Sequence, residues 1–363
     1  MMRRNSLIAL LLPVLIVGLA QPQVAQEPSL GDVARATRAT KEVRVHATRV
    51  LTVENARGDN SGETSYRETV AEILERSDFA ALEAEANHVR DGKERLPGGL
   101  WKLYIFYDTV ASPVTGGQPS TKLWAAHIDK LKRWAVAAPA SPTPLIALAQ
   151  AYVDIGFQGR GGGYSDTVSE SGWQALGAGA SLAKAALREA AALPTKCPHW
   201  YFVSEKVALA EGSSIETQNK LLAELINLEP EYYHFYREMA EYLKTKWYGN
   251  QGAMETFADQ MSARLGGREG QFVYFEIASM AYCECGDQSP HRFDWARIKQ
   301  GYQALQELYG NSNLKLNRMA LMASKFHDKP AASEAFTVIG ENWDVTVWRN
   351  RQKFSAARAW ALN

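Results

Sequence analysis

The sequence predicts an all-α protein, built as a tetratricopeptide-like array of helical hairpins, an α-solenoid. Apolar residues recur at three- and four-residue steps through most of residues 66–363, which places them on one face of successive helices. Short segments containing Pro or Gly separate these stretches, and no alternating run is convincing as a strand. Short turns make neighbouring helices antiparallel, and stacked hairpins of this kind form a solenoid.

The N-terminus has the layout of a secretory signal peptide at residues 1–20. Arg3 and Arg4 precede an apolar run at 7–19 that is too short for a comfortable membrane span, and small residues follow at the expected cleavage site. An uncleaved anchor is the alternative. Residues 21–65 are rich in Gln, Ala, Arg, Thr and Gly, which predicts a mobile linker. We therefore expect an exported protein, periplasmic or secreted, with a helical-repeat domain at 66–363 and no membrane span after cleavage.

Helices of the N-terminal half are expected between residues that interrupt the apolar pattern. A break at Ser77 and Asp78 divides the first helical region, and Pro97-Gly98-Gly99 ends it. A Gly-rich run at 159–163 precedes a long Ala-rich helix. The expected helical segments are 66–90, 101–110, 123–137, 145–156 and 169–192.

The C-terminal half is centred on an aromatic helix that Glu229-Pro230 opens. One face of this helix carries Tyr232, Phe235, Tyr236, Met239, Leu243 and Trp247. The other expected helical segments are 199–210, 215–228, 254–265, 272–285, 292–309, 314–326, 331–339 and 345–361.

Several motifs resemble those of the bacterial family known as domain of unknown function 4034. The most specific are Glu229-Pro230-Glu231-Tyr232-Tyr233 and Trp247-Tyr248-Gly249; the others lie at 78–83, 97–103, 159–161, 197–200 and 266–270. The resemblance covers residues 66–363 and implies the same helical-repeat fold. Because the family has no assigned activity or catalytic residues, the resemblance implies no reaction.

Charge and cysteine content restrict the partners and cofactors. The chain has 40 Lys and Arg against 40 Asp and Glu, without a basic cluster, which argues against a general nucleic-acid binder. In an exported protein, three cysteines allow one disulfide, which joins Cys197 to Cys283 or Cys285, or less favourably joins the last two. The spacing of these cysteines with His199 and His291 is not that of a structural zinc site, so we expect no metal and no cofactor.

Two groups of residues are candidates for ligand or partner binding. The Gly-rich run at 159–163 contains Arg160 and is followed by Tyr164; it could bind an anion through backbone N–H groups and Arg160. The Lys-Ser/Thr end of a P-loop is missing, and a flexible connection is the alternative. Tyr233, Trp247 and Tyr248 are aromatic side chains of the kind that binding patches favour. We expect Tyr233 and Tyr248 to line a concave surface; packing in the core is the alternative.

These observations predict a non-enzymatic protein that binds a protein or peptide partner in the cell envelope. The sequence has no Gly-x-Ser-x-Gly or His-Glu-x-x-His motif, and we assign no catalytic residue. The alternative is a hydrolase-like envelope enzyme, acting on a cell-wall substrate, whose site is assembled from several helices. A deep pocket that holds converging Asp, Glu, His or Arg side chains would favour the enzyme, and a long, shallow aromatic groove would favour the binding protein.

Overall fold

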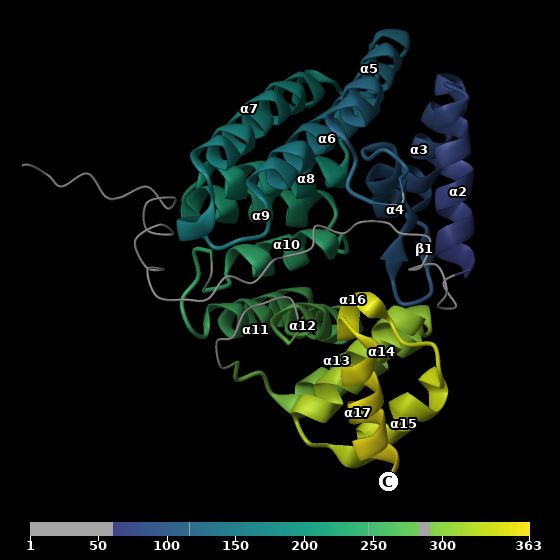
Figure 1. The fold of residues 1–363 in the computed structure, drawn as a ribbon, viewed down its shortest axis with the longest axis vertical. Coiled ribbons are helices and arrows are strands. Elements are labelled where there is room, and N and C mark those ends of the chain that lie inside the picture. Colours follow the sequence, from purple (N-terminus) through teal and green to yellow (C-terminus); the bar gives the residue numbers. More distant parts are fainter. Residues whose placement is uncertain (1–60, 116, 246, 283–290) are drawn as a thin grey trace, which may run out of the picture.

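A computed structural model of the chain describes residues 61–115, 117–245, 247–282 and 291–363 (Figure 1). Within these residues the protein is all-α, as the sequence predicts, apart from one short β-hairpin. Helices of the N-terminal half form the upper part of Figure 1, those of the C-terminal half form the lower part, and α10 lies between them. The predicted signal peptide and residues 21–60 of the predicted linker lie outside the described residues.

The helices follow the order that apolar periodicity predicts. In the N-terminal half they are α2 (Ser61–Glu75), α3 (Phe79–Gly92), α4 (Lys102–Val110), α5 (Thr121–Ala137), α6 (Thr143–Arg160), α7 (Glu170–Ala192), α8 (Pro198–Glu211) and α9 (Ile215–Leu228). In the C-terminal half they are α10 (His234–Tyr242), α11 (Ala253–Leu265), α12 (Gly267–Ala281), α13 (Trp295–Tyr309), α14 (Asn313–Lys325), α15 (Lys329–Ile339), α16 (Val345–Trp348) and α17 (Arg351–Leu362). Side-chain caps fix several of the starts; Asp78, Ser120 and Ser214 each accept a hydrogen bond from a backbone N–H of the first turn.

Some boundaries differ from the sequence prediction. The first described helix begins at Ser61, inside the segment expected to be a linker. The expected C-terminal helix at 345–361 is two helices, because Arg349 adopts a positive φ of 67° between α16 and α17. The helix expected at 272–285 instead spans Gly267–Ala281.

The central aromatic helix is shorter than its periodicity predicts. After Tyr242 the chain folds back, and the backbone N–H of Tyr248 donates to the Tyr242 carbonyl over 3.2 Å. A Cβ atom at Gly249 would lie 1.7 Å from the carbonyl oxygen of Leu243, so this turn has no room for a side chain. The Trp247-Tyr248-Gly249 motif therefore ends a helix with a tight turn.

Six helices form a continuous series through the molecule. In chain order, α4, α6, α8, α10, α12 and α14 each contact the next, and we call them the stacked helices. Four of them also pack against the helix that follows in the chain: α6 against α7, α8 against α9, α12 against α13 and α14 against α15. Side chains far apart in sequence thereby meet along the series.

Buried apolar side chains form one large cluster and one smaller cluster. The large cluster extends from α2 to α14, and the smaller one joins α14, α15, α16 and α17 around Phe336, Trp348 and Phe354. In the described part of the chain, none of the helices combines the length and the apolar character needed to cross a membrane.

The β-hairpin connects the two halves of the fold. Its strands, β1 (Arg95–Leu96) and β2 (Leu100–Trp101), are antiparallel, and Pro97-Gly98-Gly99 forms the turn between them. The backbone N–H of Gly98 donates to the carbonyls of Tyr309 at 3.3 Å and Gly310 at 3.1 Å, just before α14. The guanidinium of Arg95 lies 4.5 Å from the Trp101 ring and 4.6 Å from the Tyr309 ring, so it joins the hairpin to α13 by cation–π contact on both faces.

Alanine at two glycines can separate the cost of the hairpin contact from the cost of backbone strain. Gly98 and Gly252 both have a positive φ, of 79° and 86°, so alanine introduces backbone strain at either site. Only at Gly98 would the new Cβ atom meet a neighbour, the Ser312 hydroxyl at 2.5 Å, whereas the space around Gly252 is open. We expect Gly98→Ala to lower the free energy of unfolding by about 1–3 kcal/mol more than Gly252→Ala does. Urea denaturation measures both, and equal losses would show that the hairpin contact contributes nothing to stability.

Candidate functional site

Two histidines at the centre of the molecule stack on aromatic rings of α4. The rings of Tyr107 and His199 are parallel within 3° with centroids 4.3 Å apart, and those of Tyr104 and His234 are parallel within 2° at 3.8 Å. Positions 104 and 107 are one turn apart on α4, so both tyrosines face the same way. His199 lies on α8 and His234 begins α10. These two stacks therefore fix α4 against two later helices.

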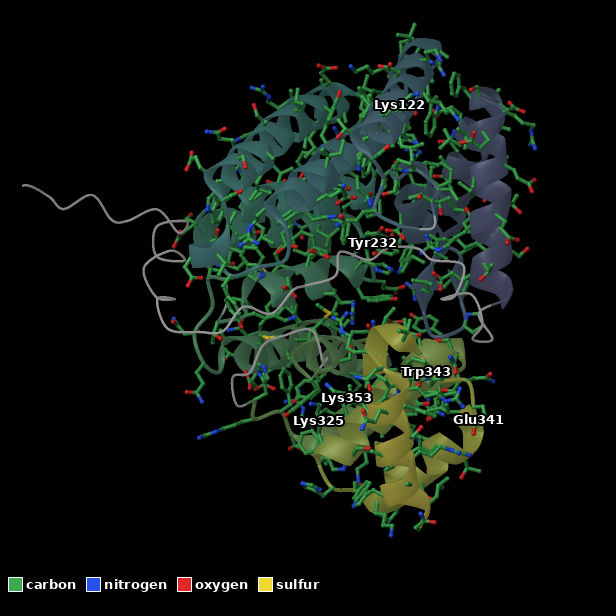
Figure 2. The ribbon with its side chains drawn as sticks, in the orientation of Figure 1. Lys122, Tyr232, Lys325, Glu341, Trp343 and Lys353 are labelled. Atoms are coloured by element: carbon green, nitrogen blue, oxygen red, sulfur yellow. The ribbon has the colours of Figure 1, made fainter. Side chains whose placement is uncertain are left out.

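His199 is completely buried and hydrogen bonded at both ring nitrogens. Its Nε2 lies 2.6 Å from Oε1 of Gln150, and its Nδ1 lies 2.6 Å from the hydroxyl of Tyr232. Because the amide oxygen only accepts, Nε2 donates to Gln150 and Nδ1 accepts from Tyr232. Burial lowers the pKa of His199 well below its usual value, so the ring is neutral. Figure 2 shows Tyr232 near the middle of the molecule, where this bond joins α8 to the turn before α10.

Three charged residues from three stacked helices converge beside the histidines. They are Asp154 on α6, Lys206 on α8 and Glu238 on α10, and we call them the central charged cluster. Asp154 follows Gln150 by one helical turn, and Glu238 follows His234 by one turn, so each charge lies on the same helix face as the buried polar residue before it. Lys206 forms an ion pair with Asp154, and the two side chains keep 18% and 20% of their exposure. Solvent therefore reaches this pair.

The protein surroundings shift the pKa of each member of the cluster. Burial raises the pKa of Asp154, and Lys206 opposes this shift. Burial also raises the pKa of Glu238 to about 7; Lys206 lowers it and Glu241 raises it further. For Lys206, burial acts to lower the pKa, but Asp154 and Glu238 together outweigh it and raise the pKa. Near neutral pH, Glu238 is therefore present both as an acid and as a carboxylate, which suits a group that exchanges protons.

A further buried acid lies next to the cluster. Glu205 on α8 is 1% exposed, and neither of its carboxylate oxygens has a hydrogen-bond partner among the described residues. Burial raises its pKa well above the usual value, and Glu238 and Glu241 raise it further. Glu241 itself pairs with the buried Lys244 over 2.6 Å. Acidic groups thus outnumber basic ones around the central charged cluster.

The structure brings together two of the binding residues that the sequence predicts. Arg160 is buried, and its Nη1 donates to the carbonyls of Gly161 and Gly163 at 3.0 Å each. Its guanidinium also lies 5.0 Å from the ring of Trp173 and 4.9 Å from that of Trp247. These contacts fold the Gly-rich loop around Arg160, at whose far end Tyr164 is half-buried. The indole N–H of Trp247 donates to Glu241 over 2.9 Å, which links the loop to the acids beside the cluster.

The two predicted tyrosines of the concave surface lie in different surroundings. Tyr233 is 2% exposed and packs against Phe272 on α12, with ring centroids 5.1 Å apart. Tyr248 is half-buried, donates to the carbonyl of Leu209 on α8 over 3.3 Å and packs against Tyr242. Tyr233 therefore contributes to packing and does not line an exposed surface.

Only some of the residues predicted to form a disulfide lie in the part of the chain that the structure describes. Cys197 is a buried free thiol with its Sγ 3.5 Å from the Tyr107 hydroxyl. Cys283 and Cys285, the predicted disulfide partners, lie outside the described residues. In the part of the chain that the structure describes, we find no group of three or more His, Cys, Asp or Glu side chains placed to hold a metal ion.

The sequence alone did not predict the central charged cluster. Asp154, Lys206 and Glu238 are single charges in separate helical segments, and the only signal was their one- or two-turn offset from buried polar residues. Comparison with family models, with curated proteins and with solved structures finds no match to the chain. The chemistry of the site therefore has to be inferred from its own residues.

The hydrogen bond between Tyr232 and His199 predicts a specific stability loss. Tyr232→Phe keeps the ring but leaves the buried Nδ1 of His199 without a donor, so we expect a loss of about 1–3 kcal/mol in the free energy of unfolding. Tyr201→Phe removes a hydroxyl from a half-buried ring on the same helix as His199 and serves as the control. Chemical denaturation compares the two, and similar small losses would show that the bond to His199 is not stabilising.

The raised pKa of Glu238 predicts how stability depends on pH. A carboxyl group with a higher pKa in the folded state binds its proton more tightly when folded. The free energy of unfolding therefore falls as pH rises from the pKa of the unfolded carboxyl group towards about 7. We expect wild type to lose stability relative to Glu238→Gln over this range. Glu307→Gln, which replaces an exposed carboxylate paired with Arg268, is the control. A pH-independent difference between wild type and Glu238→Gln would contradict the shifted pKa.

Proposed function

We propose that this protein is an exported, tetratricopeptide-like helical array that binds a protein or peptide partner in the bacterial cell envelope. We further propose that the partner contacts the central charged cluster. The observation that supports this proposal is the convergence of charged, solvent-reached side chains from α6, α8 and α10. Export is supported by the arrangement of residues 1–20, in which two arginines precede a short apolar run.

The spacing of the stacked helices suits an extended peptide. Packed helices lie about 9 Å apart, and an extended chain advances about 3.4 Å per residue. Every third residue of such a peptide would therefore meet a new helix, and with it Asp154, Lys206 or Glu238. Because Asp154 and Glu238 lie on the two outer helices of the three and Lys206 on the middle one, we expect basic residues in the partner segment opposite the two acids.

A second candidate function is hydrolysis of a cell-wall glycan or peptide. One observation favours it: Glu238 has a pKa of about 7 and lies beside the Lys206–Asp154 pair. A carboxyl group with a pKa near the working pH is suited to general acid–base catalysis. Structural ion-pair networks shift pKa values in the same way, so the binding function remains the leading proposal.

Selection from a peptide library displayed on phage tests the binding proposal with the full chain. We expect peptides with basic residues about six positions apart, opposite the two acids, and affinities by fluorescence anisotropy that fall about tenfold or more in Asp154→Asn. Glu307→Gln is the matched control, because it also neutralises an acid but on an exposed surface.

Two results would count against the binding proposal. Failure to select any peptide, or equal binding by Asp154→Asn and Glu307→Gln, would contradict it. Cleavage of a labelled envelope peptide or glycan by wild type, lost in Glu238→Gln, would instead support the second candidate.

A further inference from the structure

A second charged centre lies where α10, α12 and α14 meet. The carboxylate of Glu276, on α12, is completely buried and faces three cationic side chains. Lys315 forms an ion pair with its Oε1, Arg237 lies 2.9 Å from its Oε2, and Arg318 lies 3.5 Å from the same oxygen. We call these four residues the Glu276 centre.

The Glu276 centre has more positive than negative charge. When all four groups are ionised, three cations face one carboxylate, which leaves two positive charges in a largely desolvated place. Asp344 acts on Arg318 only at longer range, and its Oδ1 accepts from the backbone N–H of Thr346 at the start of α16. Buried charge without a counter-charge is costly, so the centre favours either loss of a proton or gain of an anion.

Proton loss falls on Lys315. Burial lowers its pKa to about 7, Glu276 opposes the shift, and Arg318 and Arg237 lower the pKa further. Burial also lowers the pKa of Arg318 to about 10, and Arg237 adds to that shift. Burial and the repulsion among the three cations together outweigh the attraction of the single carboxylate.

The two arginines differ in how their donors are used. Arg237 is satisfied by the backbone and side-chain oxygens of Glu276, by Ser279 Oγ at 2.9 Å and by Met280 Sδ at 2.7 Å. The guanidinium of Arg318 makes no hydrogen bond to the described residues, and its ion pair there is the long one with Glu276. The side chain of Arg318 is 19% exposed, so solvent reaches part of it. The guanidinium of Arg318 is therefore the group of the centre whose donors remain for a ligand.

A neighbouring histidine has an unused ring nitrogen. His234 is 5% exposed and its Nε2 has no hydrogen-bond partner among the described residues. Burial lowers its pKa well below the usual value, and Lys315 and Arg237 are the two largest charge effects in the same direction. His234 therefore lies close enough to feel the cations, and its neutral ring provides them with no counter-charge.

We propose that the Glu276 centre binds phosphate, either free or as a phosphate monoester, through the guanidinium of Arg318 with Lys315 and Arg237 supplying charge. Two positive charges in excess match a phosphate dianion, and the planar fork of arginine matches two of its oxygens. Glu276 holds the cations in position and neutralises only one of their three charges. This site lies on α10, α12 and α14, and it does not require the partner proposed for the central charged cluster.

Bound phosphate also predicts proton uptake. A dianion next to Lys315 favours the ammonium form, so binding near pH 7 converts neutral lysine to the charged form. Titration calorimetry with inorganic phosphate, repeated in buffers of different ionisation heat, measures both the affinity and the protons taken up. We expect saturable one-site binding by the full chain with proton uptake, and saturable binding without that uptake in Lys315→Met.

Variants of Arg318 test the site itself. We expect Arg318→Gln to bind phosphate about tenfold or more weakly, because it loses a charge-assisted fork. Arg318→Lys, which keeps the charge but not the fork, should fall between it and wild type. Arg268→Gln, which removes an exposed arginine that pairs with Glu307, is the matched control and should bind as wild type does. Circular dichroism shows whether each variant is folded before it is titrated.

A second titrant distinguishes free phosphate from a phosphate monoester as the ligand. Tighter binding of O-phosphoserine than of inorganic phosphate would identify a phosphate monoester, and the reverse would identify the free ion. Absence of saturable binding at millimolar phosphate would overturn the proposal. Equal affinity in folded Arg318→Gln and Arg268→Gln would overturn it as well.

Discussion

The packing of α4 against the two buried histidines is the constraint on which the rest of the structure depends. Tyr107 stacks on His199 and Tyr104 stacks on His234, so one short helix holds α8 and α10 at fixed positions. Both rings have to stay neutral, because a charged imidazole would be buried without a counter-charge; burial lowers the pKa of each well below its usual value. The hydrogen bonds of His199 to Gln150 and Tyr232 extend this restraint to α6 and to the turn before α10.

Two charged centres of opposite character follow from that arrangement. Helices α6, α8 and α10 bring Asp154, Lys206 and Glu238 together, with Glu205 and Glu241 nearby, where acids are in excess. Helices α10, α12 and α14 surround Glu276 with three cations, where bases are in excess. Helix α10 belongs to both, and Arg237 and Glu238 are adjacent on it. A single ligand with basic and phosphorylated groups would therefore find complementary charge along the stacked helices.

The sequence predicts where the helices lie along the chain, but it does not predict which helices pack against one another. The break at Ser77 is predicted correctly, and Ser77 indeed has a positive φ of 54° between α2 and α3. Tyr233 was expected on a surface because adjacent residues of a helix face different ways, but it precedes α10 and is buried. Periodicity identifies the buried face of a helix and not the helix that covers it, so the meeting of Asp154, Lys206 and Glu238 could not be predicted. The resemblance to domain of unknown function 4034, export and the peptide partner remain predictions.

The central claim is that three helices far apart in sequence place Asp154, Lys206 and Glu238 in one electrostatic cluster. A carbon-13 NMR titration of the glutamate carboxyl groups tests it most directly, in wild type and in Lys206→Met, with Glu238 assigned from its loss in Glu238→Gln. The account predicts a midpoint near 7 for Glu238 in wild type, which rises in Lys206→Met because the positive charge that lowers it is gone. A midpoint near the ordinary glutamate value of about 4.3, or one that Lys206→Met leaves unchanged, would contradict the account.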